Sequence, residues 1–463
     1  AQCLVGSEMC IRDSDGTSRF MKDQRWNFFP SFSLGWNVAR ENFWKPLESV
    51  VNQFKLRGSW GELGNQNTSN LYPFYEILPV KSNSGNWLVN GGKTNTADIP
   101  SLVSTLLTWE RVRSFNVGFD FGAFSNRLTG SFDYFVRKTV DMVGPAPQLP
   151  LVLGIAPAIV NNADMKSYGF EIELSWRDRI GEVDYGVKFN LADAQQKVVK
   201  YPNTTNAFSD WYAGKMSGEI WGYTSLGIAK TDEEMKEHLA SLPNGGQNQL
   251  GNKWGAGDIM YADINGDGKV DGGKGTLADP GDQRIIGNST PRYNFGLVLD
   301  ASYKGFDVSI FFQGVGKRDY APIVGTNGAV FWGAVNNIWQ SMAMEEHFDY
   351  FRPEGHPMGA NLNGYYPRPD FTSNKNHQVQ TRYLQDASYI RLKNLQIGYT
   401  LPKQWINKLH INRCRVYVSG DNLWTGTSLA SMFDPETLAA GDWGSGKTYP
   451  LSKVISFGLN VNF

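Results

Sequence analysis

The chain has 463 residues with 44 Lys and Arg against 45 Asp and Glu, so its formal net charge of −1 offers no basic surface for nucleic acid. It contains 50 Gly and is 13% aromatic, a composition that favours many strands and tight turns over packed helices. No stretch approaches the roughly 18 unbroken apolar residues of a membrane-spanning helix. An all-β fold is expected, and both a soluble sandwich and a membrane barrel are compatible with this composition.

The opening stretch, AQCLVGSEMCIRDS, looks like translated sequencing-adaptor read-through. It lacks the basic start, the apolar core and the small-residue cleavage site of a signal peptide. We therefore expect residues 1–14 to be disordered and assign residues 15–463 to the fold. Cys414 is then the one remaining thiol, and a lone cysteine in a strand does not indicate catalysis.

Large apolar residues alternate with small or polar ones along much of the chain. This period of two predicts strands, the clearest of which cover 30–39, 115–122, 128–137, 168–176, 185–191, 293–299, 306–312 and 455–463. Many segments reach the roughly ten residues that a tilted strand needs to cross a bilayer, whereas soluble strands usually have about five or six. We expect about eleven strands, the last ending on Phe463.

The connections between these strands alternate in length. Short ones at 125–127, 178–183 and 304–305 are followed by long ones at 62–106, 144–165, 198–290 and 318–386. Outer-membrane barrels have this asymmetry, with short periplasmic turns and long extracellular loops. The apolar face is then expected to contact outer-membrane lipid, while the polar face lines a wet interior. An odd strand count indicates a fragment, because single-chain bacterial barrels have even counts.

A series of short motifs follows the same order along the chain. They are Phe29 to Trp36, Lys55 to Gly61, Gly64 to Gln66, Thr108 to Glu110, Asp133 to Phe135, Gly169 to Glu171, Gly257 to Asp271, Ile286 to Asn288, Tyr389 to Asn394, Asp421 to Trp424 and Asp434 to Glu436. In this order they resemble the SusC/RagA family of TonB-linked outer-membrane proteins. The resemblance covers nearly everything after residue 20.

The resemblance implies active import across the bacterial outer membrane, with no enzymatic activity. Members of the family form a multi-pass barrel of about 22 antiparallel strands closed by an N-terminal plug. They work with a SusD-like surface lipoprotein and with the TonB complex, and they import oligosaccharides or peptides. We expect this chain to be the C-terminal part of such a barrel, without the plug and the TonB-contacting region, so that transport belongs to the parent protein.

A candidate Ca²⁺ loop runs from Asp263 to Asp271. Its oxygen ligands at positions one, three and five, and its Gly at six, match the calcium loop of an EF-hand. Lys274 stands where a bidentate carboxylate is expected, although Asp279 or Asp282 could replace it. The alternative is that Asp and Gly only build an exposed turn. The candidate ligands are Asp263, Asn265, Asp267, Lys269 (through its carbonyl), Asp271 and Asp282.

Aromatic residues of the long loops form a second candidate site, because flat apolar rings can pack on sugars. The candidates for substrate contact are Trp211, Tyr212, Trp221, Tyr223, Trp332, Trp339, Tyr365 and Tyr366. The alternative is that these rings pack against one another.

No catalytic constellation is found: the five histidines have no zinc-type spacing, and no nucleophile elbow or phosphate-binding glycine loop is present. Two other functions stay open. One is a siderophore or vitamin receptor of the same barrel type. The other is a secreted all-β carbohydrate-binding or hydrolytic protein, which would fold in water without detergent.

Overall fold

The computed structural model describes residues 6–66, 68, 71–144, 150, 152, 154–155, 157–322, 330–335, 343–406, 411–438 and 449–463. The chain divides into two compact units. The first contains residues 1–171, 194–206 and 210–216, and the second contains residues 172–193, 207–209 and 217–463. No helix in the described part of the chain is long and apolar enough to cross a membrane.

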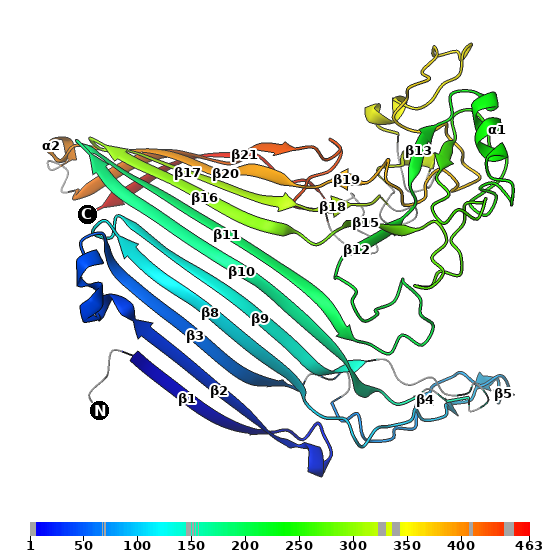
Figure 1. Ribbon diagram of the computed structural model, residues 1–463, viewed down its shortest axis with the longest axis horizontal. Coiled ribbons are helices and arrows are strands. Elements are labelled where there is room, and N and C mark those ends of the chain that lie inside the picture. Colours follow the sequence, from blue (N-terminus) through cyan, green and yellow to red (C-terminus); the bar gives the residue numbers. More distant parts are fainter. Residues whose placement is uncertain are drawn as a thin grey trace. The chain divides into compact units, whose positions relative to one another are not determined.

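Long antiparallel strands dominate the first unit. They are paired in chain order and lie side by side (Figure 1). Their bounds are β1 (Gly6–Gly16), β2 (Trp26–Asn37), β3 (Val51–Asn65), β8 (Glu110–Ala123) and β9 (Leu128–Gly144). The 3-10 helices at this end of the chain are η1 (Lys22–Gln24), η2 (Val38–Arg40) and η3 (Asn42–Leu47).

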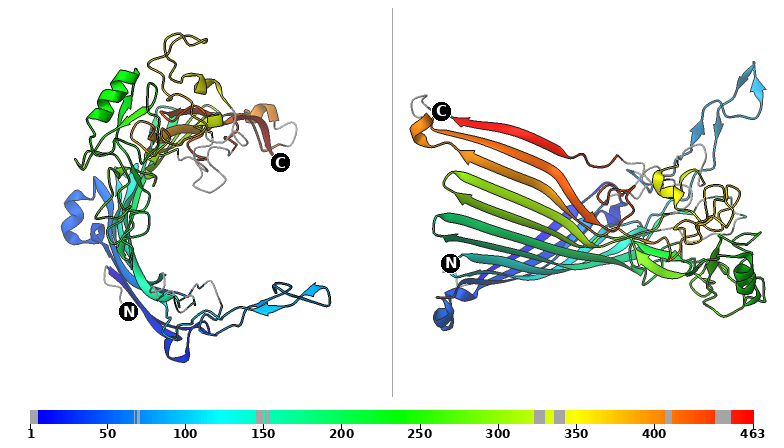
Figure 2. Two further views of the ribbon diagram at one scale, coloured as in Figure 1. Left: turned by 90° about the vertical axis from the view of Figure 1, so that its right-hand side faces the viewer. Right: turned by 90° about the horizontal axis from the view of Figure 1, so that it is seen from above.

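An arm joins β3 to β8 and extends past the ends of these strands (Figure 2). It consists of two short antiparallel pairs, β4 (Val80–Lys81) with β7 (Thr96–Ala97) and β5 (Leu88–Val89) with β6 (Gly92–Lys93). At the base of the arm, Phe20, Phe29, Leu107 and Trp109 form a small buried cluster. This cluster packs the end of the arm and the segment before β2 against Phe29 of β2.

The sheet continues beyond β9 to a total of twelve strands. The further strands are β10 (Val160–Ile180), β11 (Val183–Lys200), β16 (Arg292–Tyr303), β17 (Phe306–Lys317), β20 (Tyr389–Thr400), β21 (Arg413–Thr427) and β22 (Val454–Asn462). Each pair with a described register in this sheet is antiparallel, as the period-two pattern predicts, and the long connections fall where the sequence places them.

The long connections between β11 and β16 and between β17 and β20 carry shorter strands of their own, and their residues 217–291 and 318–388 belong to the second unit. These short strands pair as β12 (Glu219–Gly222) with β15 (Arg284–Asn288), β13 (Ser225–Ile228) with β14 (Ile259–Tyr261), and β18 (Asp319–Tyr320) with β19 (Gln385–Asp386). Helix α1 (Asp232–Ala240) and the 3-10 helices η5 (Gly333–Val335) and η6 (Glu345–Phe348) belong to these loops. Helix α2 (Lys403–Ile406) lies at the opposite end of the strands (Figure 1).

The described part of the chain start differs from the expectation of disorder over residues 1–14. Gly6–Gly16 forms β1 and pairs with β2 in continuous register, from Gly6 opposite Trp36 to Gly16 opposite Trp26, whereas residues 1–5 lie outside the described residues. Backbone pairing explains this, because the free edge of a strand offers N–H and C=O groups to any extended segment whatever its side chains. This strand adds one to the eleven that the sequence predicts.

Two tight turns show why glycine is required between long strands. Lys304 and Gly305 connect β16 to β17 with φ angles of 47° and 90°, as a two-residue hairpin turn demands. A Cβ on Gly305 would lie 2.8 Å from the carbonyl oxygen of Thr400, whereas a Cβ on Gly181, in the turn between β10 and β11, would meet no atom within 4 Å.

These two glycines form a matched pair for a stability test. Gly181→Ala should cost about 1 kcal/mol, because its φ of 62° is strained for a residue with a side chain. Gly305→Ala should lose more unfolding free energy than Gly181→Ala. Its φ of 90° is strained as well, and the added Cβ would clash with the carbonyl oxygen of Thr400. Urea unfolding in detergent would measure both values, and equal losses would contradict the clash.

Candidate functional site

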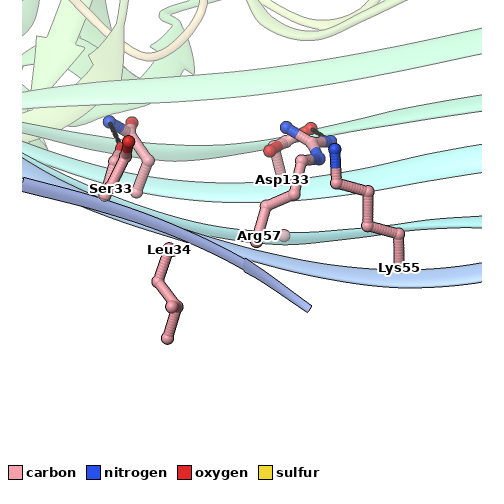
Figure 3. Close-up of a pocket in the computed structure, with 10 residues that line it drawn as sticks. Ser33, Leu34, Lys55, Arg57 and Asp133 are labelled. Atoms are coloured by element: carbon pink, nitrogen blue, oxygen red, sulfur yellow. Dashed lines mark hydrogen bonds and ion pairs between the residues drawn. The ribbon is translucent and has the colours of Figure 1, made fainter. Parts of the chain in front are cut away.

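The polar face of the sheet carries a network of ion pairs in the first unit. Arg57 on β3 donates from Nε to Asp120 on β8 at 2.8 Å and from Nη2 to Asp133 on β9 at 2.8 Å. Ser33, Lys55, Arg57 and Asp133 extend to one side of the strands, while Leu34 points to the other (Figure 3). The alternation read from the sequence thus separates two faces of different chemistry.

The second unit has the same kind of polar face. Arg415 on β21 donates from Nε to Asp307 on β17 at 2.9 Å and from Nη2 to Gln396 on β20 at 2.9 Å. Arg292 on β16 forms a bidentate ion pair with Asp193 on β11. Such bidentate pairs between neighbouring strands hold the guanidinium in place and leave a hydrated, charged surface.

The opposite face is apolar and exposed. Leu34 has 50% of its surface accessible, and the other large apolar residues of this face are also open. They include Trp36, Leu56, Trp60, Phe115, Val117 and Tyr134 in the first unit and Ile397, Val416, Phe457 and Leu459 in the second. A soluble sheet covers such a face with a second layer, so rows of exposed rings and aliphatic chains indicate a surface made for an apolar solvent.

The long loops of the second unit have their own apolar core. Its buried members are Tyr223, Leu242, Ile259, Tyr261, Val270, Phe331, Trp332, Tyr366, Tyr383, Ala387, Leu429, Phe433 and Leu438. Three of the candidate sugar-stacking residues, Tyr223, Trp332 and Tyr366, are therefore packing residues in this structure. A ring face covered by protein cannot stack on a sugar, and the packing alternative holds for these three.

The other candidate aromatics are not among the buried members of that core, although Tyr365 packs against it, with its ring centroid 5.0 Å from that of Tyr366. Trp221 stacks on Phe208 with ring centroids 4.6 Å apart, and the hydroxyl of the half-buried Tyr365 accepts a hydrogen bond from Gln385. Tyr212 is half-buried in the first unit, whereas Trp211 remains 40% exposed beside Tyr201. Trp339 lies outside the described residues. Contact with substrate stays a prediction, which Trp211 fits best because its ring is open.

A buried charge cluster that the sequence did not reveal connects the two long loops. The carboxylate of Asp258 is fully buried and accepts hydrogen bonds from Arg368, from Lys375 at 2.9 Å and from Asn376 at 2.9 Å. The Lys375 side chain also lies over the ring of Trp254. Because Asp258 and Lys375 are 117 residues apart, no local pattern could have paired them.

The aspartate loop closes largely through hydrogen bonds to its own backbone. The carboxylate of Asp263 accepts from the amides of Gly266 at 2.6 Å and Gly268 at 2.8 Å. Of the two carboxylates suggested as replacements at the twelfth position, Asp282 folds into the loop, where it accepts from the amides of Ile264 and Asp271. Burial of Asp282 raises the pKa of its carboxyl group.

The side chain of Lys269 also belongs to this loop. Its ammonium lies 2.5 Å from Asp271, and this hydrogen bond lowers the pKa of the Asp271 carboxyl group. The oxygen donors suit Ca²⁺ in kind. Within the described ranges, however, no group of three or more His, Cys, Asp or Glu is arranged to hold a metal ion. Ca²⁺ binding therefore stays a prediction, with Lys269 as the competitor for the same carboxylates.

His377 is the most strongly perturbed histidine of the loop core. It is 4% exposed and its ring packs against Trp332 with centroids 4.5 Å apart. Burial lowers its pKa to about 4, against the favourable field of Asp370. The imidazole is therefore neutral at pH 7, and each of its nitrogens can make one hydrogen bond.

Comparison with known proteins agrees with this geometry. TonB-dependent receptor P3 from Formosa agariphila is 29% identical over 479 residues, which cover 97% of this chain and 43% of that protein. TonB-dependent receptor SusC from Bacteroides thetaiotaomicron is 23% identical, covering 97% and 41%. The solved structure of the RagAB peptide transporter shares the fold with a TM-score of 0.71 at 22% identity, covering 96% of this chain and 44% of the other.

A long antiparallel sheet with one apolar and one charged face defines a strand-built outer-membrane protein. The chain belongs to the family described as TonB dependent receptor-like, beta-barrel, which it matches over residues 12–423. This agrees with the resemblance found in the sequence and excludes the secreted carbohydrate-binding protein. The chain spans less than half the length of the relatives named above.

The aspartate loop gives a testable expectation. At 100 times its Kd, Ca²⁺ should add about 2.7 kcal/mol to the free energy of unfolding. The melting temperature of the protein should therefore rise. Asp282→Asn should reduce this gain, because it removes the carboxylate that folds in at the twelfth position. Mg²⁺ serves as the control cation. If Ca²⁺ leaves the melting temperature unchanged, the loop does not bind the cation, and its Asp and Gly residues only build an exposed turn.

The low pKa of His377 predicts a pH dependence. Between pH 6.5 and 4 the unfolded chain binds a proton at this residue and the folded chain does not, so stability should fall as the pH falls through this range. The loss is at most about 3 kcal/mol. Hydrogen exchange of the loop core across this range would measure it, and His377→Phe should remove this part of the dependence.

Proposed function

We propose that this chain is part of the barrel of an outer-membrane importer driven by TonB. The observation that carries the proposal is the exposed apolar face of the sheet, set against an ion-paired polar face on the same strands. In a bilayer the first face contacts lipid and the second lines a hydrated interior. Membership in the receptor family supports the same assignment.

The substrate class proposed for the parent protein is an oligosaccharide or a peptide. The resemblance to SusC and the likeness to a structure described as a peptide transporter support these two classes over a siderophore or vitamin. We propose a SusD-like surface lipoprotein as partner on the same grounds, and the TonB complex as the source of energy. The exposed Trp211 is the proposed contact for a sugar ring.

Uptake by the full-length protein that contains this sequence would test the substrate class. A host lacking its own importer should gain growth on either an oligosaccharide or a peptide mixture, and this gain should need both TonB and the neighbouring lipoprotein gene. Trp211→Ala should reduce uptake of an oligosaccharide more than uptake of a peptide. Growth on a ferric siderophore alone would contradict the proposal.

The orientation of the two faces gives a sharper test. Leu34→Arg places a charge on the proposed lipid face and should cost up to about 4 kcal/mol of unfolding free energy in lipid vesicles. Ser131→Arg is the matched control, because Ser131 lies opposite Asp120 on the polar face of the same unit. It should cost less than about 1 kcal/mol. If Ser131→Arg loses more unfolding free energy than Leu34→Arg, lipid contacts the polar face and the proposed orientation is wrong.

A further inference from the structure

The connection between β2 and β3 is longer than the tight turn between β8 and β9, and it contains structure of its own. We call it the η2–η3 segment, residues 38–50, because it holds the 3-10 helices η2 and η3. It lies at the end of β2 and β3 opposite the arm (Figure 1). The carbonyl oxygen of Val50 accepts from the backbone N–H of Phe124 at 2.7 Å, so the segment is tied to the turn between β8 and β9.

Two aromatic contacts place the η2–η3 segment over the apolar face of the sheet. The ring of Trp44 stacks on the ring of Phe54 in β3, with centroids 5.2 Å apart and an angle of 5° between the planes. Phe43 meets Trp36 of β2 edge-on, with centroids 6.3 Å apart. Trp36 and Phe54 occupy positions of their strands that point to the apolar face. The segment therefore folds back over this face instead of extending beyond the strands.

The outer side of the η2–η3 segment is apolar as well. Phe43 is 62% exposed, Leu47 is 51% exposed and Val50 is 46% exposed. A layer that covers an apolar face against water turns polar residues outward. Because this segment stacks on Phe54 and still exposes large apolar side chains, its outer side fits an apolar medium and not water.

Two cations of the segment are available to a ligand. Arg40 and Lys45 are exposed, and within the described ranges neither forms an ion pair. Of the two acidic residues, Glu41 accepts from Nε1 of Trp36 at 2.9 Å, whereas Glu48 is exposed. Exposed apolar side chains beside free cations are the composition of segments that lie in a membrane interface, where the cations reach the headgroups.

The position of the segment selects one leaflet of the membrane. The short turn 125–127 lies at the same end of the strands, and short turns of outer-membrane barrels face the periplasm. The periplasmic leaflet of an outer membrane consists of phospholipid. Its phosphate oxygens accept charge-assisted hydrogen bonds from arginine and lysine. The chemistry of the segment thus matches a phospholipid at the boundary between headgroup and acyl chain.

We propose that the η2–η3 segment is a lipid anchor in the periplasmic leaflet. Phe43, Leu47 and Val50 lie at the acyl boundary, and Arg40 and Lys45 bind phospholipid phosphate. The inference rests on the proposed function, since it takes the apolar face of the sheet as the lipid face. It goes beyond that function because a connecting segment, and not only the strands, binds lipid of a stated class.

Photocrosslinking in the outer membrane tests this contact. The amino acid p-benzoylphenylalanine, whose excited ketone inserts into a neighbouring C–H bond, replaces Phe43 in the full-length protein that contains this sequence. Because Phe43 is exposed, the replacement should leave the fold intact. After irradiation, mass spectrometry of the purified protein should find an adduct that is heavier by one phospholipid.

Two positions of the same unit calibrate the crosslinking. Phe115 is 46% exposed on the apolar face of β8 and should also give a lipid adduct, whereas Tyr75 is 62% exposed in the arm and should give none. If Phe115 gives the adduct and Phe43 does not, the inference is wrong while the lipid face stands. Crosslinking of Phe43 to a second copy of the chain or to lipopolysaccharide overturns it equally. If neither Phe115 nor Phe43 gives an adduct, the proposed orientation of the sheet fails, and the anchor fails with it.

The contact with phosphate has its own test. Arg40→Gln combined with Lys45→Gln should lower the yield of the Phe43 adduct about two- to fivefold, as expected for the loss of a weak surface ion pair. Glu48→Gln is the matched control, because it removes a charge from the same exposed segment without removing a phosphate ligand. If the double variant keeps the full yield, Arg40 and Lys45 do not bind phosphate and this part of the inference is wrong.

Discussion

The structure depends on one geometric constraint, which is that successive side chains of a strand point to opposite faces. Because each strand also satisfies its backbone groups with its neighbours, the two faces are free to differ completely in chemistry. Leu34 and Ser33 are adjacent in sequence, yet one belongs to the open apolar face and the other to the surface that Arg57 and Asp133 share. A register slip of one residue would exchange the two faces along a whole strand. The interstrand ion pairs on the polar face oppose such a slip.

The strands and their connections could be predicted from sequence because their signal is local. A period of two is visible within ten residues, and the turn at Lys304 and Gly305 is readable from two. The core of the long loops could not be predicted in the same way. Trp332 and Tyr366 sit in segments without periodicity, so their rings could equally be exposed or packed, and only the structure shows them buried. The pairing of Asp258 with Lys375 joins distant segments and leaves no trace in either one.

The aspartate loop lies between these two cases. Its short-range hydrogen bonds, such as those to Asp263, follow from the spacing of Asp and Gly. The sequence also offered Asp279 and Asp282 for the twelfth position, and Asp282 accepts hydrogen bonds from the amides of Ile264 and Asp271 in this loop. What spacing could not show is the ammonium of Lys269 beside Asp271, because the motif assigns that position only a backbone role. Side-chain direction at an exposed position is set by nearby charges, which a pattern of residue types does not specify.

The buried charge cluster that joins the two long loops has a consequence for how such a protein can diversify. Asp258 lies in the loop between β11 and β16, whereas Arg368 and Lys375 lie in the loop between β17 and β20. Neither loop can complete its interior alone, since replacing one would strand buried charges of the other. New ligand preferences are therefore expected to arise by exchange of both loops together, or by changes restricted to exposed positions such as Trp211. The sheet strands can stay constant while the two loops change together as one unit.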